Sequence, residues 1–190
     1  MTLTKPQQDR HERMLNVTAR LATEGGYEAV QMRAVAVEAD VALGTLYRYF
    51  PSKEHLLVST MLRQIEALHD RLVVKPPQGT DAVGRVTDVL RRANIALQRQ
   101  QQFTVAVLRA LASGDEAVAP VVREVRDLMA GIIHSAIETD EPSERERLVT
   151  EILQEVWLSS LVAWISGVEP TSSVNRKLEA AARLLLEGVE

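Results

Sequence analysis

The sequence predicts an all-α protein of about nine helices, with a three-helix N-terminal domain followed by a larger helical domain. Apolar residues recur at helical spacing along most of the chain, and no stretch alternates with the period of two that is typical of a strand. Residues 31–50 read as two short helices joined by a tight turn, which is a helix-turn-helix unit. The helix over residues 144–166 is apolar around most of its circumference from Ile152 on, and the final helix carries an apolar stripe with Leu184 and Leu186 off it. We place the domain boundary after residue 55, which gives domains of residues 1–55 and 56–190.

The composition is that of an ordinary globular protein, with 46% hydrophobic and 25% charged residues. Cysteine is absent, which excludes disulfides, thiolate metal sites and cysteine nucleophiles and fits a reducing compartment. The first residues are polar and charged, so we expect no signal peptide. No apolar run approaches the roughly 18 residues of a membrane span. We therefore expect a cytoplasmic protein that does not enter a membrane.

The N-terminal segment predicts an arm over residues 1–7 and a helix over about 9–23. Gly25-Gly26 should end this helix, because glycine readily adopts the positive φ of a helix C′ position. A second helix begins near Gln31, and Asp40-Val41 forms the turn after it, since aspartate tolerates the left-handed conformation.

The third helix is expected over about residues 42–50, and its two faces differ. Leu46 and Phe50 are four residues apart and face inward, whereas Thr45, Arg48 and Tyr49 share the opposite face.

Further helices follow on either side of a linker. Pro51 ends the third helix, and Ser52 is a suitable N-cap for a long helix to about residue 73. The linker is the segment KPPQGT, at residues 75–80. Ser113 with Glu116 and Ser143 with Glu146 have the spacing of capping boxes. The remaining helices are expected over residues 81–100, 103–111, 120–139, 144–166 and 173–187.

The last two helices predict a homodimer. A helix that is apolar on several sides is buried on several sides, and two such helices in a small protein need a partner surface. An isologous four-helix bundle across a two-fold axis satisfies this need. The residues predicted to lie in the interface are Val156, Ser160, Val162, Ala163, Leu178, Ala181, Ala182 and Leu185.

The outer face of the helix-turn-helix predicts DNA binding, because short polar side chains on such a helix read the major groove between backbone anchors. Thr45 and Tyr49 can reach base edges, Tyr47 can donate to a phosphate, and Lys53 at a helix N-terminus can hold another. The predicted DNA-contacting residues are Gln31, Arg33, Thr45, Tyr47, Arg48, Tyr49 and Lys53.

Charge gives this prediction no support. The net charge is -4, and residues 1–57 carry equal numbers of basic and acidic residues. The alternative is that Tyr47, Tyr49 and Phe50 form an aromatic cluster that caps a small helical bundle.

The segment GGYEAVQMRAVAVEADVALGTLYRYFPSKEHLL resembles the N-terminal domain of TetR-family transcriptional regulators, and the helix count and linker extend the resemblance over nearly the whole chain. The resemblance implies a homodimeric repressor that binds a palindromic operator and releases it when a small molecule enters the C-terminal domain. Asp40 stands where the family usually has glycine. Ala42 replaces the serine or threonine that often caps the recognition helix, which leaves that cap unassigned.

A narrower resemblance is to the actinobacterial TetR-family repressors of cholesterol catabolism. It rests on YEAVQMRAVA, VALGTLYRYFPSK and VWLSSLVAWISG. In that group the effector is a steroid acyl-CoA thioester. A regulator of another pathway, such as efflux or fatty-acid metabolism, is the alternative within the family.

An effector pocket should be mostly apolar with a few polar groups. Asn94 either fixes a ligand carbonyl or faces solvent, and Arg109 either meets a ligand anion or pairs with an acid such as Asp115. The predicted ligand-binding residues are Leu90, Asn94, Leu97, Phe103, Val107, Leu108, Arg109, Leu111, Leu128, Met129, Ile132, Trp157 and Leu161.

We expect no cofactor, no metal and no catalysis. His134 and Glu138 have metal-ligand spacing, but two ligands make a weak site and a surface pair is the simpler interpretation. The sequence has no HExxH motif, no phosphate-binding glycine loop and no nucleophile with a base and an orienting group. The two remaining classes are a ligand-responsive repressor that binds operator DNA and a helical ligand-binding protein without operator recognition.

Overall fold

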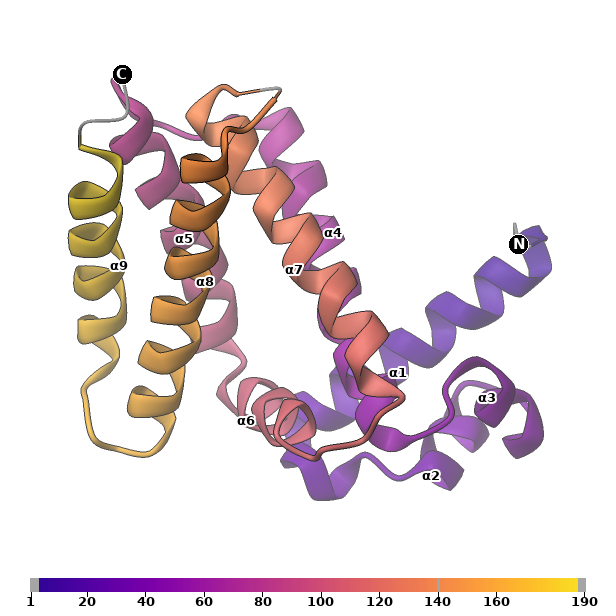
Figure 1. The fold of residues 1–190 in the computed structure, drawn as a ribbon. Coiled ribbons are helices and arrows are strands. Elements are labelled where there is room, and N and C mark those ends of the chain that lie inside the picture. Colours follow the sequence, from indigo (N-terminus) through magenta and orange to yellow (C-terminus); the bar gives the residue numbers. More distant parts are fainter. Residues whose placement is uncertain (1–3, 140, 188–190) are drawn as a thin grey trace. The chain divides into compact units, whose positions relative to one another are not determined.

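The structure is a computed structural model that describes residues 4–139 and 141–187. These residues form nine α-helices and no strand, which confirms the all-α prediction (Figure 1). The helices are α1 (Lys5–Ala29), α2 (Met32–Glu38), α3 (Leu43–Tyr49), α4 (Lys53–Val74), α5 (Ala82–Arg99), α6 (Gln101–Leu111), α7 (Val118–Ile137), α8 (Glu144–Ile165) and α9 (Thr171–Leu186).

The helices form two compact units. The first unit contains residues 1–64 and 100–125, and the second contains residues 65–99 and 126–190. The first part of α4 and the first part of α7 belong to the first unit, and the rest of each helix belongs to the second. These units describe packing, and the functional division at residue 55 stays a prediction.

In the first unit α1 packs against α6. The predicted break in α1 is present, since Gly25 and Gly26 depart from helical geometry and Gly26 has φ 66°. The predicted arm is wrong over its described part, because α1 already begins at Lys5. Thr4 and Gln7 form a capping box there, which supplies the start signal. Residues 1–3 of that arm lie outside the described residues.

The turn between α2 and α3 is closed in the way expected for a left-handed residue. Asp40 has φ 54°, and the Val41 N–H donates to the carbonyl of Ala36 at 3.0 Å. This six-to-one hydrogen bond is that of a Schellman motif. Leu46 and Phe50 are buried as predicted, and they fix α3 on the core of the unit.

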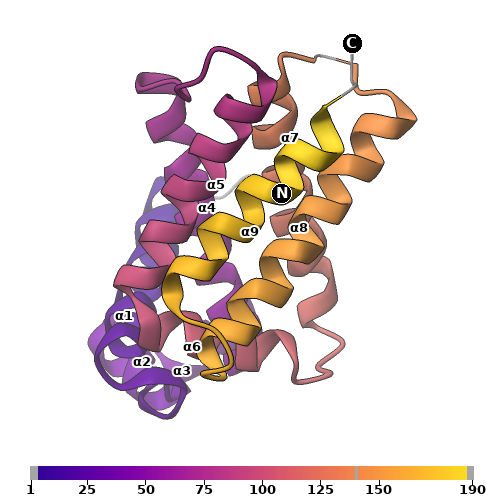
Figure 2. The ribbon, with the colours of Figure 1, turned by 90° about the vertical axis from the view of Figure 1, so that its left-hand side faces the viewer.

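In the second unit α9 packs against both α5 and α8, and Figure 2 shows α8 and α9 side by side. The predicted capping box at the start of α8 is present, with Glu146 N donating to Ser143 Oγ at 3.3 Å and Ser143 N donating to Glu146 at 2.7 Å. By length and composition α8 is the one described helix that could cross a membrane. A core helix of a globular protein passes the same test, and one stripe of α8, including Leu153 and Trp157, is buried in its own chain.

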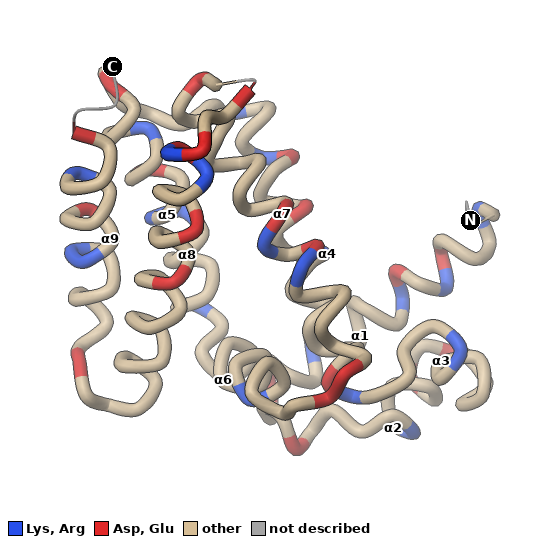
Figure 3. Tube along the Cα trace, in the orientation of Figure 1, with Lys and Arg blue, Asp and Glu red and all other residues tan. Residues whose placement is uncertain are grey.

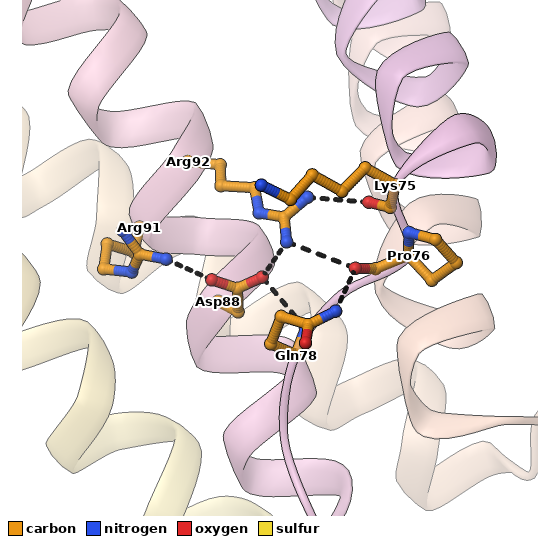
Figure 4. Close-up of polar contacts among 6 residues, drawn as sticks. All are labelled: Lys75, Pro76, Gln78, Asp88, Arg91 and Arg92. Atoms are coloured by element: carbon orange, nitrogen blue, oxygen red, sulfur yellow. Dashed lines mark hydrogen bonds and ion pairs between the residues drawn. The ribbon is translucent and has the colours of Figure 1, made fainter.

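The linker at residues 75–80 is anchored on α5 by a buried carboxylate (Figure 4). Asp88 is only 6% exposed and accepts a hydrogen bond from the Gln78 N–H at 3.0 Å. It also pairs with Arg91 and, at 2.6 Å, with Arg92. Arg92 donates in turn to the carbonyl of Lys75 at 2.7 Å. Burial raises the pKa of Asp88, but these hydrogen bonds and charges outweigh burial and leave the pKa below its ordinary value.

Candidate functional site

The outer face of α3 is accessible, as direct contact with another molecule requires. Tyr47 is 47% exposed and Arg48 is exposed, whereas Thr45 is half-buried. On α2 and at its N-cap, Arg33 and Gln31 are also exposed. The first unit therefore presents the predicted polar side chains of α2 and α3 to solvent.

The aromatic cluster considered as an alternative forms only in part. The Tyr49 and Phe50 rings lie 5.9 Å and 5.1 Å from the imidazole of His11, measured between centroids. Tyr47 makes no ring contact among the described residues. Burial lowers the pKa of His11 despite the opposing charge of Glu12, so His11 favours its neutral form against these rings. Tyr49 thus supports the recognition helix, while Tyr47 is left accessible.

The N-terminus of α4 is capped as predicted, since the His55 N–H donates to Ser52 Oγ at 3.0 Å. The Ser52 hydroxyl donates to Asp115, with 2.5 Å between the oxygens. Asp115 also accepts from the Ala117 N–H at 3.0 Å, next to the first turn of α7. The predicted Ser113–Glu116 capping box is wrong, because Asp115 takes this role and α7 begins at Val118.

Lys53, at the first position of α4, lies over the ring of Tyr27, with 3.6 Å between Nζ and the ring centroid. Arg109 on α6 lies over the same ring, with 4.0 Å between Cζ and the centroid. The Tyr27 hydroxyl donates to Glu54. That hydrogen bond, together with burial and the charge of Glu54, raises the pKa of Tyr27 to about 12. The side chain of Lys53, which is predicted to contact a DNA phosphate, is therefore held against an aromatic ring.

The local charge of the recognition segment differs from that of the whole chain. Residues 41–53 contain Arg48 and Lys53 and no acidic residue; Figure 3 marks the basic and acidic positions along the chain. A neutral N-terminal region is thus compatible with a positive working surface.

The predicted effector-binding residues of the second unit form an apolar interior with a few polar atoms. Leu90, Met129, Ile132, Trp157 and Leu161 are all buried. Asn94 is fully buried, and its amide nitrogen donates to Asn175 Oδ1 at 2.7 Å. Its burial contradicts the solvent-facing alternative, and contact with a ligand carbonyl stays a prediction. Leu97 and Leu128 are half-buried.

Several buried polar atoms of the second unit make no hydrogen bond within the described chain. Buried polar atoms are normally paired, because an unpaired one costs about 1–3 kcal/mol. The Asn94 amide oxygen and the Trp157 indole nitrogen are the two that belong to predicted effector-binding residues. The full set is Thr87 Oγ1, Asn94 Oδ1, His134 Nε2, Thr150 Oγ1 and Trp157 Nε1.

The predicted effector-binding residues on α6 belong to the first unit. Phe103 and Val107 are buried in its core, and Leu108 and Leu111 are half-buried. Arg109 points to the surface, where it pairs with Glu28 at 2.6 Å. The acid that pairs with Arg109 is thus Glu28 and not Asp115.

The structure gives no metal-binding arrangement to the described residues, since no three His, Cys, Asp or Glu side chains gather in them. His134 and Glu138 do not share a helix face, because α7 ends at Ile137 and Glu138 has φ 68°. Glu138 pairs instead with Arg85 at 3.0 Å. A surface groove of about 580 Å³ lies elsewhere in the second unit, between the start of α5 and the end of α9.

Known proteins match the chain on both sides of the linker. Residues 14–60 match the family "Bacterial regulatory proteins, tetR family", and residues 79–185 match "Tetracyclin repressor-like, C-terminal domain". The chain belongs to the TetR family. It is accordingly a helix-turn-helix transcriptional repressor and not an enzyme, in agreement with the named repressors among its relatives.

Three of these relatives carry the name HTH-type transcriptional repressor KstR. The protein of Rhodococcus jostii (strain RHA1) is 43% identical over 180 residues, which cover 95% of this chain and 84% of the relative. The protein of Mycolicibacterium smegmatis is 39% identical, with 96% and 90% covered. The crystal structure of a TetR transcriptional regulator from Rhodococcus sp. RHA1 has a TM-score of 0.90 and 31% identity, and it covers 98% of this chain and 100% of its own.

For a TetR-family dimer, the exposed apolar side chains of the last two helices are the relevant surface. Leu158 and Val162 on α8 are each 47% exposed, and Leu184 on α9 is 78% exposed. By contrast Ser160, Leu178 and Ala182 of the predicted interface are buried within their own chain. The other predicted interface residues, Val156, Ala163, Ala181 and Leu185, are half-buried.

Sequence reasoning missed the contacts of four residues of the first unit: His11, Tyr27, Glu28 and Asp115. The signal for Tyr27 was present, since it directly follows Gly26, whose positive φ turns the chain. The contacts of Asp115 with Ser52 and of Glu28 with Arg109 had no local signal, because the partners lie far apart in the sequence.

Proposed function

We propose that this protein represses transcription as a cytoplasmic homodimer on a palindromic operator, and that a steroid acyl-CoA thioester releases it. The observation that carries the DNA-binding part is the accessible face of α3, which is held on a buried core by Leu46 and Phe50. The side chains proposed to contact DNA are Gln31, Arg33, Thr45, Tyr47, Arg48, Tyr49 and Lys53.

The dimer is proposed from the apolar side chains that α8 and α9 leave exposed, notably Leu158, Val162 and Leu184. Two recognition helices related by a two-fold axis must lie about one DNA turn apart, roughly 34–36 Å, to enter successive major grooves. Because α4 continues from the DNA-binding unit into the second unit, a ligand-induced tilt of this helix would change that spacing.

The effector class is proposed from the interior of the second unit and from the resemblance to repressors of cholesterol catabolism. A solved protein of the same fold, Thermus thermophilus FadR, is described in complex with lauroyl-CoA, at a TM-score of 0.69 and 21% identity. A fatty acyl-CoA is therefore the second candidate. The unpaired Asn94 oxygen and Trp157 N–H favour the steroid, because a hydrocarbon tail would leave both unpaired, whereas a steroid hydroxyl can donate to the Asn94 oxygen and a ring oxygen can accept from the Trp157 N–H.

The DNA-binding part is tested by selecting bound sequences from random duplexes and measuring affinity for the enriched sequence by fluorescence anisotropy. We expect one palindrome, and we expect Tyr47→Ala and Lys53→Ala to weaken binding. Arg126→Ala is the matched control, since this exposed cation belongs to the second unit and pairs with Glu151 at 3.0 Å. Absence of any enriched palindrome would instead favour a ligand-binding protein without operator recognition.

The effector is tested by adding a steroid acyl-CoA, the corresponding free acid and palmitoyl-CoA to the protein–operator complex. Native mass spectrometry of the purified protein then shows which compound stays bound. We expect the steroid thioester to release the operator. Release by palmitoyl-CoA alone would overturn the steroid assignment in favour of the fatty-acyl alternative.

A further inference from the structure

The ring of Tyr27 contacts two cations that come from different helices. The ammonium of Lys53 is 3.6 Å from the ring centroid, and the guanidinium carbon of Arg109 is 4.0 Å from it. The stack, defined here as Lys53, Tyr27 and Arg109, therefore joins the first turn of α4 to α6 through the end of α1.

Each member of the stack is held by a second contact. The Tyr27 hydroxyl donates to Glu54, and Arg109 donates to Glu28 at 2.6 Å. Lys53 Nζ lies 3.5 Å from the backbone oxygen of Tyr27. The two acids balance the two cations, which limits the repulsion between the cations beside the ring.

We propose that Arg109 is a positioning residue for DNA binding: it fixes the ring of Tyr27, and the ring holds Lys53 ready to contact a DNA phosphate. The proposal rests on the proposed function, in which Lys53 contacts the operator backbone. It gives Arg109 a role different from the ligand contact predicted from the sequence. It also makes the placement of α6 one of the factors that set operator affinity.

The physical basis is the ordering of a flexible side chain before binding. Fixing a free lysine side chain on a phosphate costs about 1.5–2 kcal/mol of rotamer freedom, which is enough to cancel one exposed ionic contact and prevent it from forming. A lysine that is already ordered loses less and keeps the contact. A cation over an aromatic face is attracted to it even at an exposed site. Arg109 can be removed without opening the core, because its side chain is 58% exposed.

The experiment compares Lys53→Ala, Arg109→Ala and the double variant on one operator duplex between about 50 and 200 mM salt. We expect Arg109→Ala to weaken binding by about 5- to 30-fold, since each protomer of the dimer loses one exposed cation–π contact. We expect the double variant to bind no more weakly than Lys53→Ala alone. The control Arg126→Ala removes a similarly exposed, ion-paired cation from the second unit and should leave affinity unchanged.

The salt dependence separates positioning from a general loss of structure. Losing one phosphate contact lowers the slope of log affinity against log salt by about 0.9, or about 1.8 for two protomers. We expect Lys53→Ala to show this decrease in slope and Arg109→Ala to show most of it. Circular dichroism should show unchanged helical content in both variants. Arg109→Lys keeps a cation over the ring and should recover most of the lost affinity and slope. Tyr27→Leu should behave like Arg109→Ala.

Three results would overturn the proposal. Additive losses in the double variant would mean that Arg109 acts independently of Lys53, for example as a phosphate contact of its own. A weaker affinity with an unchanged slope would mean that Arg109 only supports the fold. If Lys53→Ala has no effect on affinity, the assigned DNA face fails as well, and Arg109 has no DNA contact to position.

Discussion

The buried carboxylate of Asp88 should be one of the largest single contributors to the stability of the second unit. Asp88→Ala removes three interactions at once, with Gln78, Arg91 and Arg92. Arg91 is half exposed, so its pair contributes at most about 1 kcal/mol. The Gln78 N–H and the 20%-exposed Arg92 lose a charged partner, which costs about 1.5–3 kcal/mol per hydrogen bond when the remaining group is buried.

We expect Asp88→Ala to lower the free energy of unfolding by about 3 kcal/mol, which should lower Tm by about 6–12 °C for a chain of this length. Asp88→Asn should lose less, because its side-chain oxygen still accepts from the Gln78 N–H. Urea unfolding measures the free energy of unfolding of both variants. The protein concentration is kept fixed, because dimerisation makes the apparent stability depend on it. Glu151→Ala is the matched control, because this acid is 55% exposed and its loss should change stability by less than about 0.5 kcal/mol.

The pH dependence gives an independent check on Asp88. Its pKa is lower in the folded protein than in the unfolded chain, so its stabilisation is complete above the unfolded pKa of about 3.9 and is lost as pH falls through the folded pKa. The difference between wild type and Asp88→Ala should be constant from about pH 5 to 7 and narrow below about pH 4. The reasoning fails if Asp88→Ala is no less stable than Glu151→Ala at neutral pH.

Three further predictions concern other groups. Ser52→Ala removes the N-cap of α4 and should cost about 0.5–2 kcal/mol in thermal unfolding, whereas Ser52→Thr, which keeps the hydroxyl, should cost less. Burial lowers the pKa of His11 and of His55, so the unfolded state binds more protons than the folded state as pH falls below about 6.5. The Tm should therefore drop between pH 7.5 and pH 5.5. If the His11→Gln/His55→Gln double variant shows the same drop, these two histidines are not its cause. Asn94→Leu removes an unpaired buried oxygen and should leave operator affinity intact while weakening release by the steroid thioester, as measured by anisotropy.

The helices could be predicted because their signals are local. Apolar spacing located all nine, and Ser52, Ser143 and Pro51 marked ends that the structure places within a residue or two. The start of α7 shows the limit of such signals. Ser113 and Asp115 are both good capping residues, and only the tertiary hydrogen bond from Ser52 shows how Asp115 is used.

The residues of the candidate site also divide into those that local signals predict and those that depend on contacts distant in sequence. The outward face of α3 follows from helical geometry, so the exposure of Tyr47 and Arg48 could be predicted. The neighbours of Arg109 could not, because Glu28 is 81 residues away in sequence. The sequence leaves Arg109 open between a ligand anion and an acid, because it does not reveal that this side of α6 faces solvent.

The neutral charge of residues 1–57 also takes on a different meaning in the folded chain. Glu12 pairs with Arg63 and Glu28 pairs with Arg109, and both arginines lie outside that segment but inside the same compact unit. Arg33 and Arg48, by contrast, form no ion pair among the described residues. The acids of this unit are therefore partly compensated by cations that a count over 57 residues leaves out, while the cations of α2 and α3 remain available. A repressor with a net charge of -4 can accordingly bind DNA with an ordinary dependence on salt, because the phosphates meet the local surface and not the chain average.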